Sequence, residues 1–133
     1  PVAAGEEDND LSQWKLIMER PVVDVVQPGV CYMGGISRTR RVAEMAAEAG
    51  LRVVRHAANT SLVTVFTMHL LGAIDNAGPY FELTIEDDWA TEMLEYDFPV
   101  KNGSLVVPDG PGWGVEIDPE WLSTSEYRRS DRS

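Results

Sequence analysis

Short apolar runs recur along this chain at intervals of roughly 25 residues, with helix-like segments between them. The four runs are Pro1–Ala4, Val22–Val26, Leu51–Val54 and Tyr80–Phe81. One strand, one helix and their two loops occupy about 25–30 residues. The rhythm therefore predicts consecutive βα units, and hence an α/β protein with a parallel sheet.

Most of these runs end close to a side chain that can do chemistry. Glu6 follows the first run, His56 the third and Glu82 the fourth. Because the carboxyl ends of parallel strands lie at one edge of a sheet, we expect these three residues to meet in space. A carboxylate such as Glu6 can bind a hard cation, and a histidine can act as a general acid or base. Structural roles remain open at this point. For His56 the alternative is a capping or packing histidine, and for Glu82 it is a structural partner for a nearby Arg or Asn.

Helical spacing places the three intervening helices at about 11–20, 37–49 and 60–74, the first capped by Asp10. The buried stripe of the third is expected to consist of Leu62, Val65, Phe66, His69, Leu70 and Ala73. Asn102-Gly103 lies between two apolar stretches and predicts a hairpin turn. We therefore expect half-barrel βα units over residues 1–86, with a C-terminal hairpin and tail over residues 87–133 packing on them.

The charge of the chain excludes some classes of partner. Its 133 residues carry a net charge of −11, which argues against binding to nucleic-acid backbones and to anionic membranes. A lone cysteine, Cys31, cannot form an internal disulfide and indicates a cytoplasmic protein. The chain begins at Pro1 directly in a strand-like run, which indicates a piece of a longer protein.

Several motifs, in this order and spacing, resemble one known family. The chain is similar to the second half of the barrel domain of the enolase superfamily, of the mandelate racemase and muconate lactonizing enzyme type. The motifs are Gly5-Glu6, Val25-Val26-Gln27-Pro28, Gly34-Gly35-Ile36-Ser37, His56-Ala57-Ala58-Asn59, Tyr80-Phe81-Glu82 and the tail over 102–115.

The resemblance implies a fold, a cofactor and roles for three residues. The fold would be strands five to eight of a TIM-type (β/α)8 barrel, and the cofactor Mg²⁺. The chemistry would be removal of a proton next to a substrate carboxylate. Glu6 would be the third metal ligand and His56 the acid or base. Glu82 would be the acid that hydrogen-bonds the substrate carboxylate or the intermediate.

Two positions depart from the family pattern. Gly29 stands where the family usually has an Asp that pairs with the histidine, so His56 is expected to be a weaker base. Arg55 precedes His56 where related sequences often carry Pro. The first half of such a barrel would also supply two more metal carboxylates and a lysine base, so we expect this chain alone to be inactive.

The favoured function is part of a sugar-acid dehydratase, ahead of a racemase, acting on a small carboxylate or sugar-acid substrate. The alternative is a non-catalytic fragment or paralogue that works as a self-associating assembly module, because a half barrel has open sheet edges. Association into a homo-oligomer or with a missing N-terminal half is expected in either case. A third, weaker hypothesis is a small flavodoxin-like binding domain.

Overall fold

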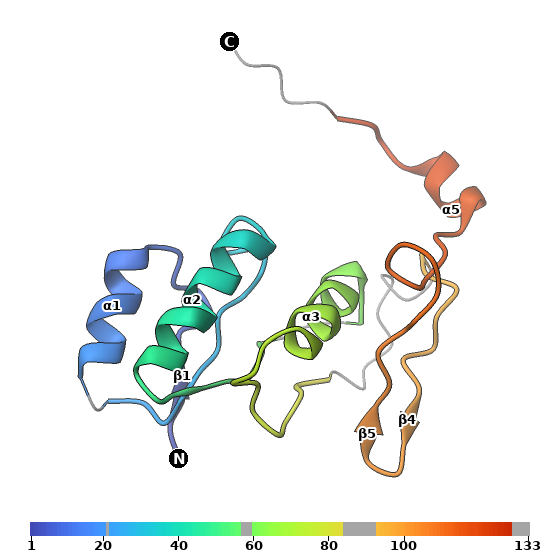
Figure 1. Cartoon of the computed structure of the whole chain (residues 1–133). Helices are drawn as coiled ribbons and strands as arrows, with labels where there is room; N and C mark the ends of the chain where they lie inside the picture. Colours follow the sequence, from blue (N-terminus) through green and yellow to red (C-terminus); the bar gives the residue numbers. More distant parts are fainter. Residues whose placement is uncertain (21, 57–59, 84–92, 129–133) are drawn as a thin grey trace.

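The computed structural model describes residues 1–20, 22–56, 60–83 and 93–128. Figure 1 shows the helices of the N-terminal part next to the short strands, and the C-terminal hairpin on the other side. None of the helices in these described segments is long and apolar enough to cross a membrane. The expected boundary between residues 86 and 87 lies outside the described residues.

Three short strands form a parallel sheet, as the regular spacing of the apolar runs predicts. Its order is β1 (Ala3–Ala4), β2 (Val25–Val26) and β3 (Arg52–Val53). Ala4 is aligned with Val26, and Val26 with Val53. All three strands therefore end at the same edge of the sheet, which confirms the α/β class and the parallel arrangement.

Helices connect and cover these strands. They are α1 (Leu11–Glu19), α2 (Ile36–Glu48) and α3 (Leu62–Gly72), and α2 packs against both of the others. Asp10 caps α1 by accepting a hydrogen bond from the Ser12 amide, as predicted. Ser61 caps α3 in a reciprocal capping box with Thr64.

The main core lies between the sheet and the first two helices. It is built from apolar side chains of both layers, and α1 contributes the fully buried Trp14. The Trp14 Nε1 donates to the Asp8 carbonyl at 3.2 Å and to the Met33 sulfur at 3.1 Å. The other buried members are Val26, Met33, Val42, Ala43, Ala46 and Val53.

The hairpin forms where Asn102-Gly103 predicts it. β4 (Val100–Lys101) pairs antiparallel with β5 (Ser104–Leu105), and Asn102 and Gly103 take φ angles of 52° and 77°. Both turn residues therefore lie in the left-handed region that a two-residue hairpin favours. A short helix, α5 (Pro119–Thr124), follows.

A second apolar cluster joins this C-terminal region to α3. Val65 and Met68 of the helix pack with Leu94 and Phe98. The predicted stripe of α3 is confirmed in part, because Val65 and Leu70 are buried. Thr64, Thr67 and Met68 are buried as well, whereas Phe66 and His69 are only partly buried and Ala73 is exposed.

The fourth apolar run does not form the predicted strand. Residues 80–83 have no regular structure, and the chain meets β3 earlier through a single parallel bridge between Ala77 and Val53. The Gly78 amide donates to the Val53 carbonyl at 2.7 Å, and the exposed Pro79 follows. The fourth segment therefore borders the sheet without extending it.

Candidate active site

Glu6, His56 and Glu82 meet at the edge where the strands end. The His56 Nδ1 lies 3.2 Å from the Glu82 Oε2 and 3.2 Å from the Glu6 Oε2. The His56 side chain is 22% exposed, and those of Glu6 and Glu82 are about half exposed. Three residues remote in the sequence thus form one cluster that solvent or a ligand can reach.

The turn after β1 places Glu6 at this edge. Gly5 takes a φ of 104°, which side chains rarely allow, and its backbone lies against the indole of Trp14. The Gln27 amide donates to the Ala4 carbonyl at 2.9 Å, so the end of β1 is also held by β2. The position of Glu6 therefore depends on a glycine and on the packing of α1 beneath it.

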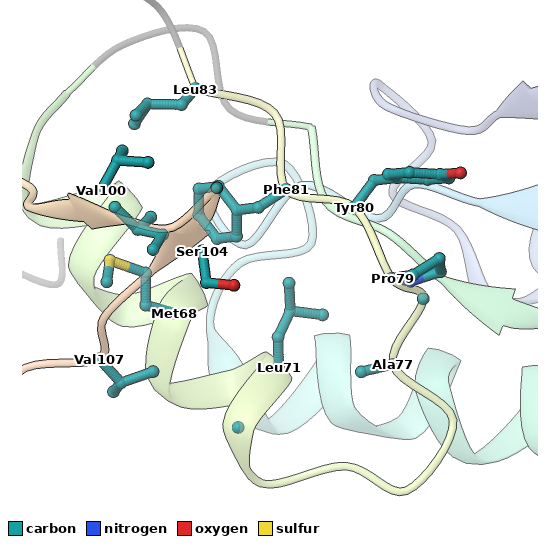
Figure 2. Close-up of a pocket in the computed structure, with 14 residues that line it drawn as sticks. Met68, Leu71, Ala77, Pro79, Tyr80, Phe81, Leu83, Val100, Ser104 and Val107 are labelled. Carbon is teal, nitrogen blue, oxygen red and sulfur yellow. The ribbon is translucent and has the colours of Figure 1, made fainter.

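The segment that carries Glu82 separates the cluster from an apolar groove. Figure 2 shows this groove, of about 520 Å³, between α3, residues 77–83 and the hairpin. Phe81 and Leu83 line the groove, whereas Glu82 between them contacts His56. None of the described residues that line the groove carries a charge. The large groove and the candidate catalytic cluster are therefore different sites.

Gly29 lies buried beside the cluster, at the position where the family pattern has an acid. A Cβ atom there would lie 2.8 Å from Cδ2 of Tyr32 and 3.0 Å from the backbone oxygen of Glu6. The Tyr32 side chain thus occupies the space that a larger residue at position 29 would need. Sequence reasoning identified Gly29 but missed Tyr32, because nothing in a single sequence indicates where this ring packs.

Arg55 is buried next to His56, with only 3% of the residue exposed. Its Nε and Nη1 have no hydrogen-bond partner among the described residues. Burial lowers the pKa of Arg55 to about 10, opposed by the nearby Cys31 and Glu82. Arg55 therefore remains charged at neutral pH inside the protein. Its burial was not predicted, because an arginine at the end of a strand is usually exposed.

The fit of a metal ion to these residues is partial. Mg²⁺ prefers oxygen ligands, and the half-exposed carboxylate of Glu6 is one such group. Within the described residues, however, no group of three His, Cys, Asp or Glu side chains could hold a metal ion. The described part of the chain can therefore contribute a ligand without forming a complete metal site.

Similarity to known proteins agrees with this arrangement. The chain is 25% identical over 118 residues to a D-xylonate dehydratase of Haloferax volcanii, covering 89% of this chain and 29% of that protein. It is 29% identical to an arabinonate dehydratase of Saccharolobus solfataricus, covering 88% and 31%. The chain thus spans about a third of the length of these curated relatives.

Solved structures show the same fold. A putative racemase from Roseobacter denitrificans is 48% identical, with a TM-score of 0.89 over 98% of this chain and 37% of that one. An enolase from Pantoea ananatis with bound D-gluconate and Mg is 26% identical, with a TM-score of 0.80 over 92% and 30%.

The family model described as enolase C-terminal domain-like matches residues 1–121. The strand order, the cluster at the strand ends and these similarities agree with one another. The chain belongs to the enolase superfamily, in the family of enolase C-terminal domain-like proteins.

Proposed function

We propose that this chain is the C-terminal barrel part of a larger Mg²⁺-dependent enzyme that removes a proton next to the carboxylate of a sugar acid. Dehydration is the reaction we favour. The observation that carries the proposal is the cluster, in which the His56 Nδ1 lies 3.2 Å from carboxylate oxygens of both Glu6 and Glu82. Relatives named as D-xylonate and arabinonate dehydratases support the choice of substrate class.

Each residue of the cluster has a role in such a reaction. When a sugar acid is dehydrated, the C2–H and C3–O bonds break, water leaves and the enol formed becomes a 2-keto-3-deoxy acid. His56 would donate a proton to the departing hydroxyl, while a base outside this chain takes the C2 proton. Glu82 would hydrogen-bond the substrate carboxylate or the intermediate through the oxygen that does not face His56. Glu6 would be one ligand of Mg²⁺, which supplies positive charge to the deprotonated substrate when bound.

Dehydration is favoured over racemisation because of Gly29. Protonating a leaving hydroxyl needs an acid, whereas racemisation also needs a strong base on the second face of the substrate. The family pattern gives that base a carboxylate partner at position 29, which this chain lacks, and the two carboxylates beside His56 also serve the metal and the substrate in the proposed reaction. Racemisation stays the second candidate, because a putative racemase is 48% identical. Exchange of the α-hydrogen with solvent deuterium, with both stereoisomers formed, would favour it.

The isolated chain is expected to be inactive. One described carboxylate cannot complete the octahedral shell that Mg²⁺ demands, and the C2 base would come from elsewhere in the protein. Turnover by the 133-residue chain alone, abolished by His56→Ala, would contradict this part of the proposal.

The chain's two histidines allow a matched test in the full-length protein. We expect His56→Asn to lower kcat for a sugar acid by about 100-fold or more, since general acid catalysis contributes that much. His69→Asn is the control, because the His69 Nε2 donates to the Trp113 carbonyl at 3.0 Å, where the tail packs on α3. Formation of the keto acid measures both. Equal losses in the two variants would refute the role of His56.

Assembly and location remain predictions. Sedimentation of this chain should show self-association, or association with the upstream part of its own protein, and a strict monomer with cooperative unfolding would count against it. A purely structural role has no support from the relatives named above, which are enzymes. A cytoplasmic location rests on the lone Cys31.

A further inference from the structure

We infer that Glu82 orients His56 in place of the acid that is absent at position 29. Glu82 accepts the Nδ1 hydrogen of the imidazole, which leaves Nε2 as the atom that exchanges a proton with the substrate. The importance of Glu82 for catalysis rests on the proposed function. The claim that Glu82 is the carboxylate bonded to Nδ1 rests on the contacts alone.

The first support is the contact geometry at Nδ1. Nδ1 of His56 and Oε2 of Glu82 form a hydrogen bond of 3.2 Å. Oε2 carries no hydrogen when Glu82 is ionised, or when the proton of Glu82 sits on its other oxygen, toward the substrate. In both cases the ring nitrogen is the donor. A neutral histidine that donates from Nδ1 carries its lone pair on Nε2. The contact therefore selects one of the two neutral forms of the ring.

The second support is the packing around Gly29. A Cβ atom at this position would lie 2.8 Å from Cδ2 of Tyr32 and 3.0 Å from the backbone oxygen of Glu6, so a side chain there needs its neighbours to shift. The Tyr32 ring is half exposed and can move, but the backbone oxygen belongs to the turn that carries the cluster. This packing favours a glycine at position 29, and the carboxylates that contact His56 come from other segments.

Two carboxylates are close enough, and the structure favours Glu82. Glu6 lies at the same distance from Nδ1, as an ion-pair contact, but its oxygens would be shared with the metal in the proposed function. The guanidinium of Arg55 attracts Glu82, so a buried positive charge helps to keep this carboxylate in place. Glu82 can thus hold His56 while Glu6 remains available for a cation.

The test is a nitrogen-15 NMR measurement of the His56 ring in the 133-residue chain. It is made at the alkaline end of a pH series, where the nitrogen-15 shifts of the ring no longer change with pH. Couplings between ring nitrogens and ring carbon-bound hydrogens show which nitrogen carries the proton. We expect the Nδ1–H form in the unmodified chain, and a shift toward the Nε2–H form in Glu82→Ala.

Glu6→Ala is the matched control, because it removes a carboxylate at the same distance from the same atom. It should leave the Nδ1–H form in place. Glu82→Gln, which keeps the size of the side chain and one acceptor oxygen, should shift the ring less than Glu82→Ala. His69 provides an internal reference in every spectrum.

Three results would overturn the assignment: an Nε2–H ring in the unmodified chain, a shift caused by Glu6→Ala alone, or no shift in either Glu82 variant. The readout does not depend on turnover. A full-length protein that fails to dehydrate sugar acids would refute the proposed function and leave this result intact. If the full-length protein dehydrates sugar acids but one of these three NMR results is found, only the role of Glu82 is refuted.

Discussion

The backbone of Gly5 lies so close to the indole of Trp14 that a Cβ atom at Gly5 would overlap the ring. Trp14 is fully buried in the main core, and Gly5 immediately precedes Glu6. The contact therefore links the core to the candidate active site. A change that lifts this turn off Trp14 would also move the Glu6 carboxylate.

Replacing Gly5 by alanine should destabilise the chain strongly. Gly5→Ala combines an unfavourable φ of 104° with overlap against a fully buried ring. We expect the free energy of unfolding to fall by about 2–4 kcal/mol, measured by urea denaturation. Gly34→Ala is the control, since Gly34 has a φ of 80° and open space around its Cβ position. Similar losses in both variants would show that Trp14 does not resist the substitution.

Gly29 and Tyr32 should be energetically coupled. Gly29→Ala places a Cβ atom 2.8 Å from the Tyr32 ring, and removal of that ring by Tyr32→Ala opens the space. We expect Gly29→Ala to cost about 1 kcal/mol less in the Tyr32→Ala background. A double-mutant cycle on the free energy of unfolding measures the difference. A coupling energy of zero would mean that the backbone oxygen of Glu6, and not the ring, limits position 29.

Replacing Arg55 by methionine should stabilise the chain. The buried guanidinium has two nitrogens without a hydrogen-bond partner among the described residues, and a buried charge costs free energy unless it is paired. We expect Arg55→Met to raise the free energy of unfolding by about 1–3 kcal/mol. Arg41→Met is the exposed control and should change it little, because Arg41 forms a surface pair with Glu44. A loss of stability in Arg55→Met would show that the attraction between Arg55 and Glu82 outweighs the cost of burying the charge.

Metal removal should leave the isolated chain unchanged. Among the described residues no group of three His, Cys, Asp or Glu side chains is arranged to hold a metal ion, so binding that would stabilise the fold is not expected. The thermal midpoint should be the same in excess chelator and in millimolar Mg²⁺. In the full-length protein, Glu6→Gln should weaken Mg²⁺ binding, which titration calorimetry can measure. Unaltered affinity in that variant would remove Glu6 from the proposed ligand set.

Local patterns in the sequence determined most of the secondary structure. Asp10 before a helical stripe predicts the start of α1, and Asn102-Gly103 predicts the hairpin, because capping and tight turns depend on a few adjacent residues. The spacing of the apolar runs likewise predicts parallel strands. Their common direction then brings Glu6, His56 and Glu82 to one edge, as the structure shows.

Only the tertiary structure determined how segments that are distant in the sequence pack against one another. It left the fourth apolar run outside the sheet, with one bridge at Ala77, and it turned Phe66 and His69 toward the tail. It also buried Arg55 and filled the space beside Gly29 with Tyr32. These outcomes depend on contacts between residues far apart in the chain. The spacing of hydrophobic residues predicts which face of a helix or strand is apolar. It does not predict which segment packs on that face, because many segments have a compatible polarity and few have a complementary shape.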